Sequence, residues 1–305
     1  MSPFTKDKSP DKSIISVKQK LSIRDKLEIY RALLSRNFIL WSRFKISALI
    51  GLVSAIVGIA VFFFINFWIG DAMGVRIAQY GYKGDFFRYV LLGLVLTNFA
   101  GISLTFYLSF LKSTYFNNWL EMVLSSPISF SLYFSIAVIW VYVVSAINVT
   151  LHLGIGAFMF GADISIPPDF WLIIVIILLT VIAISGIGLM AASMFLLFDV
   201  KGSKEPISWF FSTFAGLVSG MMFPPELFLE IAPPLYYLSR IFPHTYAMDA
   251  FRRVMDGAGL GSTIVMNDIL ILIIFCIILL PLGTFMFRRG IVKAERTGKL
   301  ARWGA

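Results

Sequence analysis

Long apolar segments alternate with short polar ones along most of the chain. Glycines, prolines and charges separate them, most clearly in "DVKGSKEP", which holds four charges and two helix breakers. About 20 apolar residues suffice for an α-helix to cross the hydrocarbon core of a bilayer. The pattern therefore predicts an all-α polytopic membrane protein with six transmembrane helices. The predicted spans are about 47–69 (ending at Gly70), 87–111, 130–158, 169–198, 206–223 and 264–287.

Composition and charge support this assignment and give it an orientation. Of the 305 residues, 58% are apolar and 14% are charged, against about 45–50% and about 25% in soluble domains. With the N-terminus inside, 20 of the 26 Lys and Arg residues lie on inner segments and 6 on outer ones. Cytoplasmic loops are enriched in Lys and Arg, so this bias predicts that both termini are cytoplasmic. We expect a multi-pass protein of the cell (plasma) membrane.

The N-terminal region divides into a polar tail and an amphipathic helix. Residues 1–20 are Lys-rich and predict a flexible cytosolic tail, as residues 291–305 predict a basic one. Residues 21–45 place Ile23, Leu27, Leu34 and Phe38 on one helical face, with charged residues such as Arg31 elsewhere. An apolar stripe beside basic residues favours a helix that lies in the membrane interface. The alternative is a helix packed on a soluble partner.

The segment after the fifth span is apolar but cannot cross the membrane. Pro224-Pro225 ends the span, and Pro233-Pro234 divides residues 226–242 into pieces of one to two turns. Freed backbone groups in lipid must be buried or hydrated, so we expect an external re-entrant helical hairpin that dips into the outer leaflet. An ordinary extracellular loop is the alternative. Residues 244–259 predict an amphipathic surface helix that is stopped by Gly257 and Gly259.

The predicted loop between the second and third spans contains a short helical pattern. Phe116, Trp119, Leu120 and Val123 share one face, while Glu121 lies off it, and Pro127 ends the helix. Such a helix on the cytosolic side can act as a lever that docks in a groove of a soluble subunit. A plain interfacial turn fits the same pattern.

These segments together resemble the ABC-2 type transporter permeases. "LEMVLSSPIS" (120–129) is similar to the family's Leu-Glu-x-Leu-Leu-x-Thr-Pro-Ile-Ser segment. "PHTYAMDAFRRVM" (243–255), after a span and a proline-rich hairpin, resembles the family's closing Pro-x-Thr-Tyr-x-x-Asp-x-x-Arg pattern. The matching positions are Pro243, Thr245, Tyr246, Asp249 and Arg252. The N-terminal amphipathic helix is similar to the family's connecting helix, whereas the neutral "STYFNN" departs from the charged, Gly-containing run that often precedes the coupling helix.

The resemblance implies the membrane subunit of an exporter, with residues 46–290 as its ABC-2 type transmembrane domain. It implies a dimer of two copies, or of one copy and a paralogue, in contact with membrane lipid. A separate ABC ATPase subunit would use ATP and Mg²⁺ and bind the connecting helix (Ile23, Leu27, Arg31, Leu34 and Phe38) and a coupling loop (Phe116, Trp119, Leu120, Glu121, Val123 and Pro127). The implied external gate comprises Pro224, Pro225, Glu226, Pro233, Pro234, Tyr236, Pro243, Tyr246, Asp249 and Arg252.

Motifs for chemistry within the chain itself are missing. There is no G-x-x-x-x-G-K-[ST] phosphate-binding loop and no H-E-x-x-H zinc motif, so we expect no bound cofactor, no metal and no enzymatic activity of this chain alone. Nucleic acid is not an expected partner. Asn148 and His152 lie within the third span, either as part of a polar pathway or as an interior histidine that bonds a neighbouring helix. The competing functions are a secondary transporter or channel that uses these two residues, and a membrane scaffold.

Overall fold

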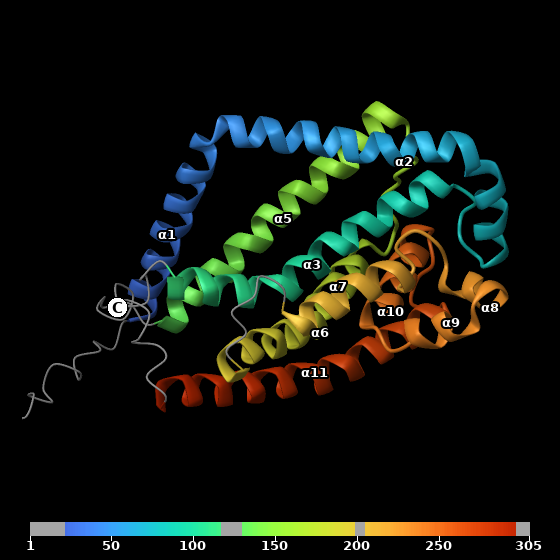
Figure 1. Cartoon of the computed structure of the whole chain (residues 1–305). Coiled ribbons are helices and arrows are strands. Elements are labelled where there is room, and N and C mark those ends of the chain that lie inside the picture. Colours follow the sequence, from blue (N-terminus) through green and yellow to red (C-terminus); the bar gives the residue numbers. More distant parts are fainter. Residues whose placement is uncertain (1–21, 117–129, 199–204, 297–305) are drawn as a thin grey trace, which may run out of the picture.

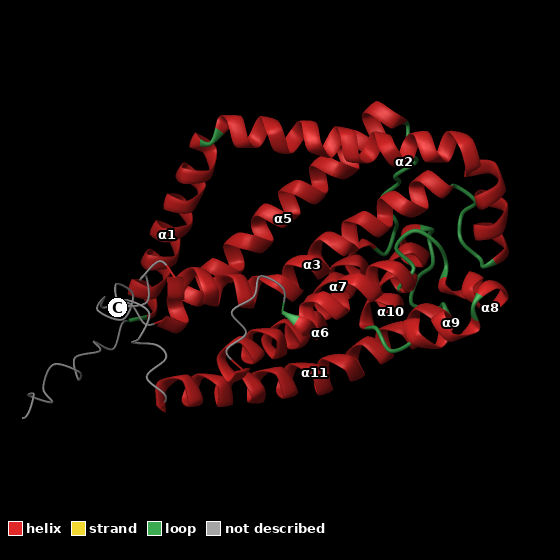
Figure 2. Ribbon diagram, in the orientation of Figure 1, coloured by secondary structure: helices red, strands yellow, loops and turns green. Residues whose placement is uncertain are grey.

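The computed structural model describes residues 22–116, 130–198 and 205–296, and over these ranges the chain contains helices and no strand (Figures 1 and 2). The long helices are α2 (Lys45–Gln79), α3 (Phe86–Phe116), α5 (Phe130–Phe160), α6 (Phe170–Phe198) and α11 (Thr263–Arg296). The others are α1 (Ile23–Arg43), α7 (Pro206–Val218), the 3₁₀ turn η2 (Pro225–Leu227), α8 (Phe228–Ile231), α9 (Pro233–Ser239) and α10 (Pro243–Met255).

Five of the predicted spans are confirmed as helices long and apolar enough to cross a membrane: α2, α3, α5, α6 and α11. The sixth is not confirmed, because α7 has only 13 residues and rises about 20 Å. Beyond Val218 the chain turns at Gly220, whose φ of 92° suits glycine and not a residue with a Cβ. The predicted span 206–223 is thus a shorter helix followed by a turn.

The first predicted span is longer in the structure than in the prediction. The end at Gly70 is wrong, since α2 continues through it to Gln79. A single glycine inside a helix costs only about 1 kcal/mol relative to alanine, which cannot stop a helix whose other residues favour it. The helix ends instead before Gly81, which has a φ of 85°.

The core of the molecule lies along α6, which packs against α3 on one side and α11 on the other. In the most apolar part of α6, 61% of the residues are buried, against 17% in α11 and 11% in α2. The backbones of α6 and α11 meet at two glycines. A Cβ added to Gly283 would lie 2.2 Å from the carbonyl oxygen of Gly186. Small residues allow helices in membranes to approach in this way.

At the other side of the bundle, α1 and α2 both contact α5. They meet in an elbow at Phe44, which is the C-cap of α1 and the N-cap of α2 (Figure 1). The predicted helix at 21–45 is confirmed as α1, whose start carries a capping box between Ser22 and Asp25. A hydroxyl–hydroxyl hydrogen bond between Tyr30 and Ser135 ties α1 to α5.

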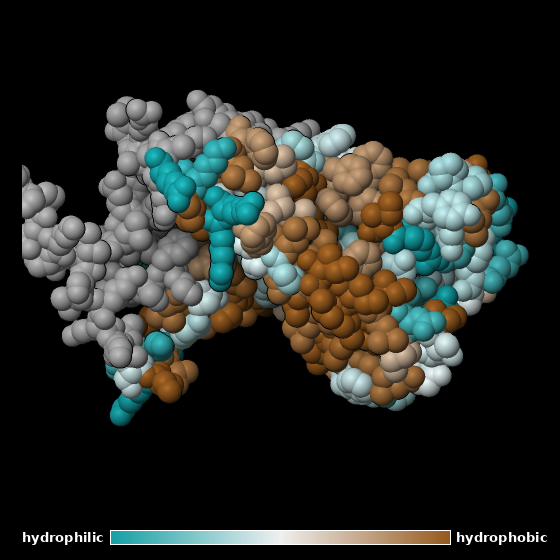
Figure 3. Space-filling view, turned by 90° about the horizontal axis from the view of Figure 1, so that it is seen from below, coloured by the Kyte–Doolittle hydropathy of each residue, from teal (hydrophilic) through white to brown (hydrophobic). Residues whose placement is uncertain are grey.

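Much of the surface of the long helices is apolar. Seen from below, a broad hydrophobic area fills the middle of the molecule, and polar residues gather at the end where α8 and α9 lie (Figure 3). Exposed apolar residues of α11 include Ile274, Ile277 and Ile278. An exposed apolar surface of this extent fits contact with lipid and not with water.

Candidate functional site

The segment between α7 and α11 folds into η2, α8, α9 and α10 at one end of the bundle (Figure 1). Pro233 occupies the first position of α9 and Pro225 the first position of η2. Proline is tolerated there because the first helical residues have no intrahelical acceptor for their N–H groups. The predicted division of this segment by its prolines is therefore confirmed. Its depth in the outer leaflet remains a prediction.

The prediction that residues 244–259 form a surface helix is wrong. In α10, 11 of the 13 residues are buried, and the helix packs between α6, α11 and α3. Its end is as expected, with Gly257 at a φ of 97° directly after the C-cap. The charged residues of its polar face are buried or partly buried and are bound by one another and by groups from other elements, so amphipathic spacing here indicates a polar interior and not a surface.

Arg252 of α10 is 2% exposed and holds three elements together. Its Nε donates to the carbonyl oxygen of Tyr89 at 3.1 Å, its Nη1 to that of Gly220 at 2.5 Å and its Nη2 to that of Met221 at 2.8 Å. The guanidinium also lies 3.5 Å from the centre of the Tyr89 ring. These bonds join α10 to α3 and to the turn after α7.

Asp249 joins α10 to the loop between α2 and α3. Its Oδ1 accepts hydrogen bonds from the Tyr82 hydroxyl at 2.9 Å and from Arg253 Nε at 2.5 Å. Burial raises the pKa of Tyr82 well above its usual range, so the phenol keeps its proton and remains a donor. Arg253 in turn covers the Tyr82 ring at 4.7 Å.

A buried ion pair between Arg88 and Asp256 makes the third link. Arg88 lies in the first turn of α3, is 2% exposed and also donates to the carbonyl oxygen of Met255 at 2.7 Å. Asp256 accepts the backbone N–H of Lys83 at 3.1 Å. Sequence reasoning missed Arg88 and Asp256. The available signal was an arginine at the edge of an apolar span, which needs a partner in such a position.

The short helices are bound by two further polar groups. Arg240 donates to Glu226 at 2.7 Å and to the Tyr236 hydroxyl at 3.0 Å, which links η2 to the C-terminal end of α9. Glu230 of α8 accepts from Arg76 at 3.0 Å and from the Tyr80 hydroxyl at 2.9 Å, at the end of α2. Of the predicted gate residues, the structure thus brings together Glu226 and Tyr236.

Two further side chains of α10, Tyr246 and His244, belong to the segment between α7 and α11. The Tyr246 hydroxyl donates to the carbonyl oxygen of Arg240 at 3.1 Å, and burial raises the pKa of Tyr246. His244 is enclosed, and its Nδ1 has no hydrogen-bond partner among the described residues. Burial lowers the pKa of His244 to about 4, so the imidazole is neutral at neutral pH.

A polar groove of about 520 Å³ lies between α3 and α7. Its lining includes three hydroxyl residues of α7, Ser208, Ser212 and Thr213, and two of α3, Thr105 and Ser109. The fold of α7 depends on a further lining residue, Glu205, whose carboxylate caps the helix by accepting the N–H groups of residues 207 and 208 at 2.7 Å. No motif or spacing in the sequence indicated this groove.

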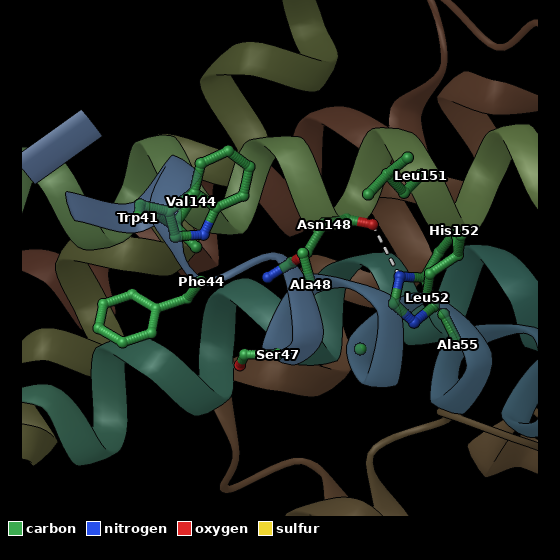
Figure 4. A pocket seen from close by; sticks show the side chains of 11 residues that line it. Trp41, Phe44, Ser47, Ala48, Leu52, Ala55, Val144, Asn148, Leu151 and His152 are labelled. Atoms are coloured by element: carbon green, nitrogen blue, oxygen red, sulfur yellow. Dashed lines mark hydrogen bonds between the residues drawn. The ribbon is translucent and has the colours of Figure 1, made fainter. Parts of the chain in front are cut away.

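Asn148 and His152 share a second cavity, of about 220 Å³, in the corner between the α1–α2 elbow and α5 (Figure 4). Trp41 and Phe44 also line it. The Nδ1 atom of His152 lies 2.7 Å from the carbonyl oxygen of Asn148. The histidine is therefore bonded within its own helix, and the expected bond to a neighbouring helix is not present among the described residues.

The predicted cytosolic contacts are only partly described. Phe116 is the last residue of α3, and Trp119, Leu120, Glu121, Val123 and Pro127 lie outside the described residues. In α1, Ile23 is 79% and Leu27 64% exposed, and Phe38 and Arg31 are exposed as well. Leu34 is partly buried. Most of the apolar face of α1 is thus not covered by the part of the chain that the structure describes.

Comparison with known families gives one match. The family described as "ABC-2 family transporter protein" matches residues 116–285, more than half of the 305 residues. The matched range begins at the end of α3 and includes α5 to α10 and most of α11. Neither the curated proteins nor the solved structures gave a match. No group of three or more metal-binding side chains occurs among the described residues.

Proposed function

The chain belongs to the ABC-2 transporter family, and on that premise we propose that it is the permease subunit of an ATP-driven exporter. The substrate is an amphipathic molecule of the drug, lipid or lipid-linked glycan class, moved outward. A separate ABC ATPase subunit supplies the energy with ATP and Mg²⁺, because this chain has no phosphate-binding loop. The chain is then a transport subunit of the cell membrane and not an enzyme by itself.

The groove between α3 and α7 is the observation that carries the proposal. It places five hydroxyl side chains on two neighbouring helices of a membrane bundle. Polar side chains facing lipid are unfavourable, and in membrane proteins they face water or other protein. The buried Ser208 hydroxyl also has no partner among the described residues. A second permease copy, or a paralogue, opposite this groove would enclose a polar path between the two subunits.

The assembly of η2 to α10 suits the role of an external gate. Arg252, Asp249 and Asp256 bind groups that precede or begin α3 or follow α7, so the short helices are coupled to the spans next to the groove. A tilt of α3 or α7 would therefore move the gate with them. Force would enter at α1 and at the loop that begins after Phe116, where the ATPase subunit is expected to bind.

The alternative, a secondary transporter or channel, needs ionisable groups along the spans. Among the described residues, the buried charged side chains of the long helices are Arg88 and Asp268. Both lie within the first turns of their helices, at the end of the bundle where α10 is packed (Figure 1). Among the described residues, a relay through the middle of the bundle would have to depend on His152 and on neutral polar groups, such as Asn148 and the Ser103–Tyr142 and Ser145–Asn98 pairs, which makes this alternative the weaker one.

The test is transport by the purified chain in liposomes, with and without an ABC ATPase subunit that copurifies with it. A fluorescent phosphatidylcholine serves as the amphipathic probe. The proposal expects movement between leaflets only with the ATPase and ATP, and a loss on Ser212→Leu, which fills the groove. The matched change Thr284→Val, on an exposed hydroxyl of α11 outside the groove, should have no effect. Movement without ATPase and ATP would support the secondary transporter instead.

A further inference from the structure

The cavity at the α1–α2 elbow contains two polar side chains of α5, Asn148 and His152, that belong neither to the η2–α10 segment nor to the α3–α7 groove. Asn148 and His152 are four residues apart on one face of α5, and in Figure 4 both extend toward the first turns of α2. The cavity is lined by α1, α2 and α5, whereas the groove lies between α3 and α7. It is therefore a separate site on the lateral side of the bundle.

The two polar side chains offer unused hydrogen-bonding groups. The side-chain amide of Asn148 is exposed and has no partner among the described residues. Since a carbonyl oxygen can only accept, the Nδ1 atom of His152 donates to the carbonyl of Asn148. In the neutral imidazole the Nε2 atom is then an acceptor. From α5 the cavity thus presents one amide and one acceptor nitrogen, Ser47 and Trp41 add a hydroxyl and an indole N–H, and the lining carries no Lys, Arg, Asp or Glu.

The cavity extends along α2 away from the α1–α2 elbow. Its lining follows α2 from Phe44 to Ala55. Ala55 lies ten residues after Lys45, which corresponds to about 15 Å along the helix. With the elbow at the inner membrane interface, as the proposed topology has it, the polar end of the cavity would lie about halfway across a hydrocarbon core of about 30 Å. An unpaired amide at this depth is unfavourable unless a ligand or water satisfies it.

The size of the cavity limits what can enter it. Sites that enclose a drug-sized ligand have volumes of about 300–1,000 Å³, whereas this cavity has about 220 Å³. The cavity can hold the polar end of an amphiphile while its acyl chains remain in the bilayer. Trp41 and Phe44 at the elbow provide aromatic surface beside the entrance, in the way that such rings line membrane interfaces.

We propose that the elbow cavity binds the uncharged, hydroxyl-bearing head of an amphipathic lipid that enters sideways from the bilayer. The head donates a hydrogen bond to Nε2 of His152 and pairs with the amide of Asn148, and the acyl chain stays in the membrane. This proposal rests on the proposed export function, in which it supplies a lateral binding site for an uncharged lipid substrate.

The cavity offers a matched pair of glycines for the test. A Cβ at Gly51, which lines the cavity, and a Cβ at Gly58, which does not, both meet open space. Gly51→Leu therefore adds a large side chain to the cavity with no clash at its Cβ, and Gly58→Leu makes the same change two turns further along α2. Likewise, Asn148→Leu removes a polar group inside the cavity, and Thr150→Val removes one on α5 outside it.

The experiment is photolabelling of the full-length chain in nanodiscs, without ATPase or ATP, by a monoacylglycerol that carries a diazirine next to its glycerol head. We expect labelled residues at Leu52 and Leu151. Labelling should fall at least about tenfold in Gly51→Leu and about threefold to tenfold in Asn148→Leu, as for a lost hydrogen bond. Gly58→Leu and Thr150→Val should label like the unchanged chain.

Equal labelling of Gly51→Leu and Gly58→Leu would overturn the proposal, as would equal labelling by the matching fatty acid, whose head is charged. The result is independent of the export assay. Specific labelling without ATP-driven transport would leave the cavity standing and refute the export function. Transport that persists in Gly51→Leu without labelling would refute the cavity alone.

Discussion

The guanidinium of Arg252 lies against the ring of Tyr89, 3.5 Å from its centre, and donates from Nε to the carbonyl oxygen of the same residue. One arginine thus binds both the side chain and the backbone of α3 while its other nitrogens hold the turn after α7. Planar guanidinium geometry makes this combination possible, and the single ammonium group of lysine cannot reproduce it.

We expect Arg252→Lys to destabilise the folded protein strongly. At least two of three charge-assisted hydrogen bonds to carbonyls are lost, each of which contributes about 1.5–3 kcal/mol, so the free energy of unfolding should fall by about 3 kcal/mol or more. Thermal unfolding of the purified protein in detergent measures this. The control is Arg76→Lys in the half-exposed pair with Glu230, where a change of about 0–1 kcal/mol is expected. Similar losses in both variants would contradict the assigned role of Arg252.

A methyl group at the closest approach of α6 and α11 should force the two helices apart. The added Cβ of Gly283→Ala would lie 2.2 Å from a backbone oxygen, which cannot move as a side chain can. We expect a large fall in the yield of monodisperse protein on size-exclusion chromatography. Gly154→Ala on α5 is the control, because its Cβ meets open space. It should be neutral or stabilise the helix by about 0.5–1 kcal/mol. Equal yields from both variants would argue against the close contact.

The protein should lose stability between pH 6.5 and pH 5 through His244. Burial lowers the folded pKa to about 4 from the ordinary value of 6.5, so below pH 6.5 the unfolded chain binds a proton that the folded chain does not. The free energy of unfolding therefore falls as the pH falls, by about 2 kcal/mol over this window. The midpoint of thermal unfolding at several pH values measures the slope.

His244→Leu removes the titrating group, and its slope in the same window should be smaller by this amount. A variant that keeps the full slope would assign the pH dependence to other groups. The carboxylates of the protein interfere little in this comparison, because the two proteins share all of them.

Coupling to the ATPase should depend on the loop after α3. We expect the double change Trp119→Ala and Glu121→Ala to lower ATP-driven transport at least about tenfold, in line with the loss of an aromatic anchor at an interface. Copurification of the ATPase subunit in mild detergent should fall in parallel. Unchanged transport and copurification would exclude this loop as the contact. The paired change Trp209→Ala, on an exposed tryptophan of α7, should leave copurification intact.

The long spans could be predicted because each depends on its own local sequence. In a membrane, an apolar segment of sufficient length has few alternatives to a helix. The ends of the helices were harder to predict from the sequence. Gly70 did not end α2, since one glycine is too weak a helix breaker, while the turn at Gly220 shortened α7 below the predicted span. Both ends depend on which glycine takes up a positive φ, Gly81 after α2 and Gly220 after α7, and composition alone does not show this.

The short helices η2 to α10 show a second reason why sequence patterns predict only part of the structure. Its prolines predicted where the segment is divided, but the amphipathic spacing of α10 predicted a surface helix, whereas 11 of its 13 residues are buried. Spacing reports that two faces differ in polarity, and it does not report what lies opposite the polar face. The partners Tyr82 and Arg88 lie more than 160 positions earlier in the chain, so only the folded arrangement reveals that they enclose it.

The sequence position of those partners has a consequence for biogenesis. Tyr82, Arg88, Tyr89 and Gly220 all precede α10, so most of the groups that hydrogen-bond Asp249, Arg252 and Asp256 have left the ribosome before α10 does, and Arg253 of α10 itself supplies a further partner of Asp249. The charged helix can dock as soon as it is synthesised, since folding tends to follow the order of synthesis. α11 then arrives last and closes the bundle over a segment that is already neutralised, without exposing its charges to lipid.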